Sequence, residues 1–197
     1  KADQLQYEVD NKLLMRSFKN RFRDLVGNWV FESLIMHRAF RKPRGYPGDY
    51  RTLEWIYDNQ PFSRGIGFYF DRYFLNNPYA VAVRNRKDKM RDILQWLVWN
   101  DARGAIRVLN LACGSCRELE ELLRSGTVQK EVAFTCIDQD REALDFAKDK
   151  TTPHNQDNVT FRFVEDNILN LFKSPDHYRK SLGTYDVVYS IGLADYL

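Results

Sequence analysis

The sequence predicts an α/β fold, a Rossmann-like parallel sheet preceded by a helical region. Within residues 1–103, apolar residues recur at three- and four-residue spacing, which is typical of amphipathic helices. Beyond this point, short aliphatic and β-branched runs alternate with helical segments, which is typical of βαβ units. We therefore interpret 1–103 as a helical cap or substrate region and 104–197 as the Rossmann-like domain.

The helical region is expected to contain several helices separated by turn formers. Leu14, Phe18, Phe22 and Leu25 fall on one face of a segment over 13–40, which Gly27 is expected to divide into two helices. Clusters of glycine and proline predict loops over 41–50 and 61–67. Further helices are expected over 50–60, 68–77 and 78–100, the last with Pro78 in its first turn.

The second half is expected to contain four strands. They are expected over 105–112, 131–138, 158–166 and 185–192, with helices over 116–126 and 140–150. Asp140 is the expected N-cap of the second of these helices. The strands are nearly all apolar, as in parallel sheets that are covered on both faces.

Composition excludes several classes of protein. No apolar run is long enough to span a membrane, and three cysteines indicate a reducing, cytoplasmic setting rather than a secreted disulfide scaffold. Residues 1–103 carry 19 Lys/Arg and 12 Asp/Glu, a net +7, whereas the remainder carry 11 and 15, a net −4. The positive charge of residues 1–103 is compatible with binding to nucleic acid, to an anionic lipid surface or to an acidic substrate. It is equally compatible with an ordinary solvated helical surface. The cations of this region are scattered, which disfavours a nucleic-acid-binding tail.

The segment "NLACGSCREL", residues 110–119, permits two interpretations. Cys113 and Cys116 form a C-x-x-C, which occurs as a redox motif between a strand and a helix in thioredoxin-like folds. The same segment also fits a tight turn in which small residues such as Ala112 and Gly114 let the backbone approach a ligand at a helix N-terminus.

Polar or small residues follow each of the four predicted strands. Besides the 110–116 turn, Asp138 ends the second strand, Asp166 and Asn167 follow the third, and Ser190 follows the fourth. Parallel strands bring their carboxyl ends to one edge, where α/β sheets bind ligands. An acid at the end of the second strand can accept both hydroxyls of a ribose.

The segments "VLNLACGSCREL", "FTCIDQDREALDFAKDK", "FVEDNI" and "YDVVYSIGLADYL" together resemble the class I S-adenosylmethionine-dependent methyltransferases, transferases of the EC 2.1.1 class. That family's first loop is D-x-G-x-G-x-G, of which this chain keeps only the middle glycine. The resemblance implies that Asn110, Ala112, Cys113 and Gly114 hold the methionine part of the cofactor and that Asp138 binds the ribose. It further places Gln139 beside the adenine, Asp166 and Asn167 at the adenine edge, and Ser190 near the transferring methyl.

The segments "KPRGYPGDY", "RYFLNNPYAVAVRNR" and "YSIGLADYL" also resemble a bacterial subgroup that makes 3-hydroxy fatty acid methyl esters. This resemblance implies transfer to a fatty acyl carboxylate, which is already ionised at neutral pH and needs neither a general base nor a metal. Arg84 and Arg86 are candidates to hold the carboxylate of the substrate or of the cofactor. Tyr46 and Asp49 are lid candidates. The competing interpretations are solvated helix arginines and ordinary turn chemistry.

Other function classes stay open at this stage. An RNA methyltransferase or one acting on another small molecule would fit the same fold, and a thioredoxin-like redox protein would explain the C-x-x-C. The sequence stops soon after the fourth predicted strand, so a non-catalytic cofactor-binding or scaffold fragment, self-associating through an incomplete sheet, is a further expectation. The cysteines and histidines are too few and too scattered for a zinc site.

Overall fold

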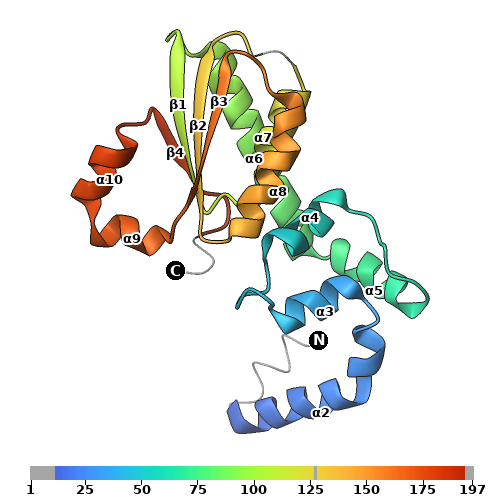
Figure 1. The fold of residues 1–197 in the computed structure, drawn as a ribbon. Helices are drawn as coiled ribbons and strands as arrows, with labels where there is room; N and C mark the ends of the chain where they lie inside the picture. Colours follow the sequence, from blue (N-terminus) through green and yellow to red (C-terminus); the bar gives the residue numbers. More distant parts are fainter. Residues whose placement is uncertain (1–11, 127, 194–197) are drawn as a thin grey trace.

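A computed structural model describes residues 12–126 and 128–193, and its first part is helical. In Figure 1 the first four of these helices lie toward one end of the molecule, and the fifth runs alongside the sheet. They are α2 (Lys12–Val30), α3 (Leu34–Arg41), α4 (Tyr50–Asp58), α5 (Ile66–Leu75) and α6 (Pro78–Asn100). None of the helices in the described part of the chain is both long and apolar enough to cross a lipid bilayer.

The second part is a parallel four-stranded sheet with flanking helices, as predicted. Its strands run in the order β3-β2-β1-β4, and Val108 lies between Phe134 and Val187 in the register. The elements are β1 (Ala105–Leu111), α7 (Arg117–Arg124), β2 (Glu131–Asp138), α8 (Arg141–Thr151), a 3-10 turn (Thr152–His154), β3 (Val159–Glu165), α9 (Ile168–Lys173), α10 (Pro175–Leu182) and β4 (Val187–Tyr189).

Helices cover both faces of this sheet (Figure 1). Because side chains alternate along a strand, Ile106 and Val108 of β1 pack with α6, α7 and α8, whereas Leu109 packs against Leu182 of α10 on the opposite face. Burial on both faces explains why the strands read as continuous apolar runs rather than as alternating ones.

Helix α6 connects the two parts. Its Leu94 and Val98 belong to the core beneath the sheet, while Ala80 in its first turn packs with Ile35 and Leu75 in a separate helical core. The long helix therefore holds the N-terminal helices in a fixed place relative to the sheet.

The structure corrects the predicted break at Gly27. Helix α2 continues through Gly27 to Val30, and the break falls at residues 31–33, where Ser33 caps α3 by accepting a hydrogen bond from the Met36 N–H at 3.1 Å. A Cβ at position 27 would lie 3.3 Å from the Phe31 ring, so the glycine serves close packing at the end of the helix rather than interrupting it.

Other predicted boundaries need smaller corrections. The fourth strand is only Val187–Tyr189, shorter than the expected 185–192, so Ser190 lies in the loop that follows it. Helices α9 and α10 were not predicted. Asp140 caps α8 as expected, its side chain accepting from the Glu142 N–H at 3.0 Å, and Pro78 occupies the first turn of α6.

Candidate functional site

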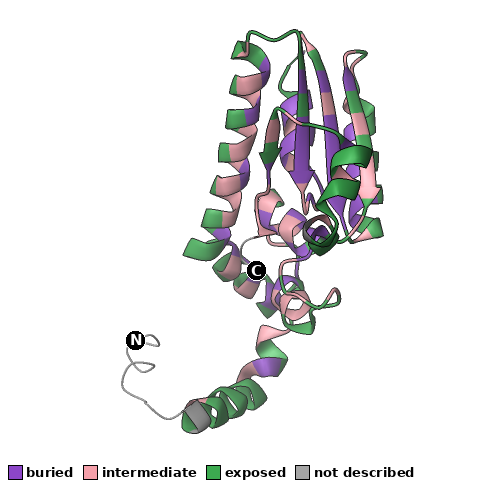
Figure 2. Cartoon of the chain, turned by 90° about the vertical axis from the view of Figure 1, so that its left-hand side faces the viewer, coloured by how far each residue is buried: buried purple, intermediate pink, exposed green. Residues whose placement is uncertain are grey.

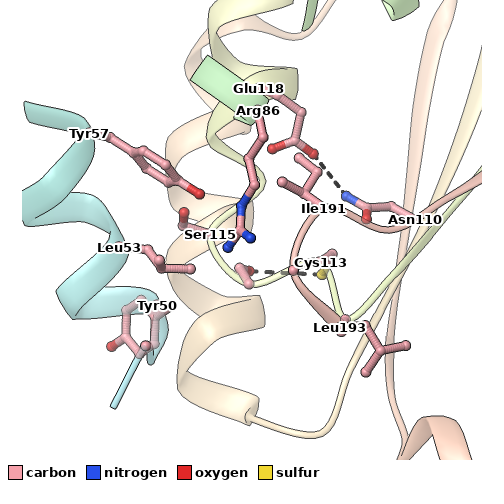
Figure 3. Close-up of a pocket in the computed structure, with 14 residues that line it drawn as sticks. Tyr50, Leu53, Tyr57, Arg86, Asn110, Cys113, Ser115, Glu118, Ile191 and Leu193 are labelled. Atoms are coloured by element: carbon pink, nitrogen blue, oxygen red, sulfur yellow. Dashed lines mark hydrogen bonds between the residues drawn. The ribbon is translucent and has the colours of Figure 1, made fainter. Parts of the chain in front are cut away.

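A pocket opens at the carboxyl ends of β1 and β4. The chain order reverses between these two strands, and such a switch point is where open α/β sheets bind ligands. The cavity volume is about 100 Å³, and the wider space of about 700 Å³ around it includes open solvent. Its walls come from Gly48, Tyr50, Leu53, Tyr57 and Arg86 of the helical region, from Asn110 near the end of β1, from 112–115 and Glu118 after that strand, and from 191–193 after β4 (Figure 3).

The loop after β1 has a strained backbone. Ala112, Gly114 and Cys116 adopt positive φ angles of 52°, 54° and 51°, and such angles in residues other than glycine are uncommon and concentrate at functional sites. The Cys113 N–H donates to the Ile137 carbonyl at 3.0 Å, which ties the loop to the end of β2. The backbone is therefore strained where the chain turns from β1 into α7.

Asp138, at the end of β2, accepts a backbone hydrogen bond from this loop. Its Oδ2 accepts from the Gly114 N–H at 2.8 Å and its Oδ1 accepts from the Asp140 N–H at 2.9 Å. Burial raises the pKa of the Asp138 carboxyl above its ordinary value, although the backbone donors oppose this effect. Each carboxylate oxygen can accept a second hydrogen bond, so the group keeps acceptor capacity for a pair of hydroxyls.

Glu118, in the first turn of α7, is a buried carboxyl in the pocket wall that the sequence analysis missed. Its Oε1 accepts from the Asn110 amide at 2.9 Å and from the Tyr189 hydroxyl at 2.7 Å. Burial raises the pKa of Glu118 to about 7, against an ordinary value of 4.5. The sequence signal for Glu118 is its position just after a candidate ligand-binding loop. An acidic residue at that position is usually interpreted as a solvated side chain at a helix N-terminus.

Glu54 of α4 attaches the helical region to the same loop. Its Oε1 accepts from the Ser115 hydroxyl at 2.7 Å, and its Oε2 pairs with the Arg117 guanidinium at 2.8 Å. Arg117 also contacts Asp58, at 3.0 Å. Because Glu54 and Ser115 are both buried, this linkage fixes α4 against the beginning of α7.

Two side chains from the helical region give the pocket its polar outer wall. Burial, and secondarily the Glu118 carboxylate, raises the pKa of the Tyr57 phenol. Arg86 extends toward the loop that carries Cys113 and Ser115 (Figure 3). A Cβ at Gly192 would lie 3.1 Å from Nη2 of Arg86, so the glycine allows the guanidinium and the segment after β4 to approach closely.

The structure brings part of the predicted site together. Five of the predicted residues line the pocket: Arg86, Asn110, Ala112, Cys113 and Gly114. Eight lie outside its lining: Tyr46, Asp49, Arg84, Asp138, Gln139, Asp166, Asn167 and Ser190.

Two of the proposed substrate residues have other contacts in the fold. Asp49 is fully buried, caps α4 by accepting from the Thr52 N–H at 2.9 Å, and pairs with Arg38 at 2.7 Å. Arg84 donates to the Leu75 carbonyl at 2.9 Å, holding the end of α5. Tyr46 is half-buried in the loop before α4. The Asp49 contacts are those of turn chemistry, whereas Arg84 holds a helix end and is not a solvated helix arginine.

The predicted adenine-side residues form one polar cluster beside the pocket, at the ends of β2 and β3. The Asn167 amide donates to the Gln139 side-chain oxygen at 2.9 Å, and the Asp166 carboxylate accepts from Asn170 at 2.7 Å and from the Tyr178 hydroxyl. The Asp166 N–H donates to the Asp138 carbonyl at 3.0 Å, which joins this cluster to the acid beneath the loop.

Ser190 follows β4 at the same edge of the sheet as the pocket, the edge formed by the carboxyl ends of the strands. Its Oγ is buried and has no hydrogen-bond partner among the residues that the structure describes. A buried hydroxyl without a partner is costly, so this atom marks a place where a ligand could supply the missing bond.

The three cysteines form a buried thiol cluster. Cys113, Cys116 and Cys136 are free, and side-chain hydrogen bonds link them. Hydrogen bonding to Cys113 and Cys136, together with full burial, raises the pKa of the Cys116 thiol. Hydrogen bonds from Cys113 and Cys116 lower the pKa of the Cys136 thiol to about 5. All three sulfurs are buried, however, whereas reactive redox cysteines are partly exposed. Within the described residues, no cluster of three or more His, Cys, Asp or Glu side chains is arranged to hold a metal ion.

Comparisons with known proteins support the fold. No protein-family model matches the chain, and no curated protein is significantly similar to it in sequence. A solved structure of a possible exported protein from Bordetella parapertussis superposes with a TM-score of 0.52 at 21% identity, covering 92% of this chain and 63% of that one.

Two other solved structures match more weakly. A SAM-dependent methyltransferase from Agrobacterium tumefaciens gives a TM-score of 0.42 at 17% identity, covering 53% of this chain and 31% of that one. The plantazolicin methyltransferase BpumL, in complex with a triazolic desmethylPZN analogue and SAH, gives 0.39 at 16% identity, covering 84% and 48%. The chain thus spans between 31% and 63% of the length of these three structures, and it shares its fold with the Bordetella structure.

Proposed function

We propose that this chain is the cofactor-binding part of an S-adenosylmethionine-dependent methyltransferase. The observation that carries the proposal is the strained 112–116 loop at the switch point, held from below by the carboxylate of Asp138. This is the arrangement that an adenosine-containing ligand needs, with close backbone approach on one side and a ribose acceptor on the other. The resemblance of four successive strand-end segments to class I methyltransferases points to the same ligand.

The residues at this edge fit such a cofactor. Apart from its two chain neighbours, none of the described residues would lie within 4 Å of a Cβ added at Gly114. Asp138 retains acceptor capacity for ribose hydroxyls, and the buried carboxyl of Glu118, oriented by the Asn110 amide in the pocket wall, would accept the ammonium of an amino acid moiety. S-adenosylmethionine supplies an electrophilic methyl group on a positively charged sulfur; the chain's task is to orient the acceptor and exclude water.

Calorimetry with S-adenosylhomocysteine tests the cofactor assignment. Asp138→Asn keeps the size of the side chain but replaces one acceptor by a donor, so binding should weaken about tenfold or more. Asp145→Asn, in an exposed ion pair with Arg141 at 3.1 Å on α8, is the matched control and should bind like the parent chain. Equal affinity of all three folded proteins, or no binding by the parent chain, contradicts the assignment.

We further propose that the acceptor is the carboxylate of a small molecule with an apolar chain, such as a 3-hydroxy fatty acid. Arg86 places a guanidinium, which matches a carboxylate geometrically, in the pocket wall. Leu53, Ile191 and Leu193 supply apolar surface beside it. In this proposal residues 1–103 act as the cap, since α4 and α6 contribute Tyr50, Tyr57 and Arg86 to the wall.

The chemistry of the product tests the acceptor. Methyl-labelled cofactor with 3-hydroxy fatty acids should give a base-labile methyl ester, and Arg86→Gln should raise KM for the acid more than it lowers kcat. Lys89→Gln, an exposed cation on the same helix, is the control. A base-stable methyl group on an RNA, with steeply salt-dependent RNA binding, would support an RNA acceptor and contradict the carboxylate.

A further inference from the structure

Helix α2 carries an exposed row of large apolar side chains. Leu14, Phe18, Phe22, Leu25 and Trp29 are 60%, 61%, 56%, 70% and 59% exposed, and we call these five residues the apolar stripe. At about 100° per residue they fall within one quadrant of the helix. Single exposed apolar residues are ordinary on protein surfaces, but a continuous row of five indicates an interaction surface.

The stripe faces away from the other described helices and from the sheet. The buried residue of α2 is Gly27, which lies against the Phe31 ring on roughly the opposite side of the helix. Arg23, also opposite the stripe, lies over the Phe40 ring of α3 at 5.3 Å. Figure 2 shows α2 exposed along most of its length, away from the sheet. Among the described residues, therefore, packing occurs on the reverse side and leaves the stripe in solvent.

The charge of the helix indicates what covers the stripe. Five of its residues are Lys or Arg and one is Asp, and helical geometry places Lys19 and Arg21 on the two flanks of the stripe. Both side chains are exposed. A helix with Leu, Phe and Trp on one face and Lys and Arg beside it is the pattern that lies in a membrane interface, where long cationic side chains reach the phosphates.

We propose that the apolar stripe of α2 binds the surface of an anionic lipid bilayer, with the helix lying in the plane of the interface. Charge argues against a second copy of the same face as the occupant, because pairing two stripes would bring Lys19 and Arg21 of both helices together, and the one acidic residue of the helix is Asp24. An anionic surface instead attracts each cation near it. The helix lies on the bilayer and does not cross it, in keeping with its charge and hydropathy.

Vesicle flotation with the full chain tests this surface. We expect binding to vesicles of equal parts phosphatidylglycerol and phosphatidylcholine, weak binding to phosphatidylcholine alone, and release at high salt. Replacing Phe18→Ser together with Phe22→Ser should weaken binding about tenfold or more. The matched control is Tyr69→Ser with Tyr73→Ser, two aromatic residues that are 68% and 71% exposed and four positions apart on α5.

Two further measurements place the helix in the bilayer. Brominated lipid should quench tryptophan fluorescence in the parent chain, and the quenching should largely disappear in Trp29→Phe. Lys19→Glu with Arg21→Glu should abolish the preference for anionic lipid. No flotation, equal binding by the parent and the two-serine variant of α2, or equal loss in the tyrosine control would overturn the proposal. A dimer that the two-serine variant dissociates would identify a second copy as the occupant instead.

Discussion

The amide of Asn110 donates a hydrogen bond to Oε1 of Glu118 at 2.9 Å, across the turn that joins β1 to α7. The bond joins the end of a buried strand to the first turn of the helix that follows it, so the asparagine orients the Glu118 carboxyl within the pocket wall.

The buried Glu118 gives stability a specific pH dependence. Its folded-state pKa of about 7 lies above the ordinary 4.5, so the folded protein binds more protons than the unfolded chain between these values. Stability contributed by this group therefore falls as pH rises from about 4.5 to 7, by at most about 1.4 kcal/mol per pH unit.

Glu118→Gln tests this dependence because glutamine keeps an oxygen acceptor for Asn110 and Tyr189 but does not titrate. Urea unfolding at a series of pH values should show the variant gaining stability relative to the parent chain as pH rises through this window. Asp138 and Glu54 also have raised pKa values, but they are common to both proteins. Two parallel stability profiles would show that Glu118 ionises normally.

Removing the buried partner of Arg117 should lower the free energy of unfolding more than removing its exposed partner. Glu54→Ala removes both the acceptor of the Ser115 hydroxyl and a buried ion-pair partner, which should cost about 3 kcal/mol. Asp58→Ala removes an exposed partner of the same guanidinium and should cost about 0.5 kcal/mol or less. Chemical denaturation of both variants measures the difference, and similar losses would mean that the Glu54 linkage adds nothing beyond a surface contact.

The sequence predicted the sheet because its local signals were strong. The β1 and β2 segments are apolar and short, and turn formers or polar residues bound them, so periodicity and length were sufficient. Asp140 and Pro78 were recognisable from local rules for helix termini. Helices α9 and α10 were missed because both are short and α10 is mostly polar. Leu182 becomes a core residue, with Tyr178 packed against it, only through contact with the face of the sheet opposite α6.

The pocket was less predictable because its walls come from distant segments. Tyr57 and Leu53 belong to a helix that precedes β1 by about fifty residues, and the Tyr189 bond to Glu118 spans 71 positions. No local pattern distinguishes such residues from an ordinary helix face. Conversely, Asp49 looked like a site residue from its Gly/Pro-rich surroundings, yet its contacts are those of a helix cap and a buried ion pair.

The three thiols should be protected in the folded protein. Cys116 and Cys136 are fully buried and Cys113 is 8% exposed, so their reaction with a thiol reagent such as DTNB requires local opening. Modification should be about a hundredfold slower than in denaturant, and Cys113 should react first because it borders the pocket. Mass spectrometry after mild peroxide treatment tests whether the C-x-x-C forms a disulfide instead. A rapidly formed Cys113–Cys116 disulfide would favour the redox interpretation.

Gly67 provides the sharpest test of how the N-terminal helices pack. An added Cβ at this position would lie 2.2 Å from the carbonyl oxygen of Glu32, which is backbone and cannot move aside cheaply. Gly67→Ala should therefore destabilise the protein by about 2 kcal/mol or more, in spite of the better helix propensity of alanine. Gly104→Ala, where the added Cβ meets nothing within 4 Å, is the matched control and should change stability by about 0.5 kcal/mol or less. If thermal unfolding shows equal effects for the two variants, the close approach of α5 to the segment between α2 and α3 is not present in solution.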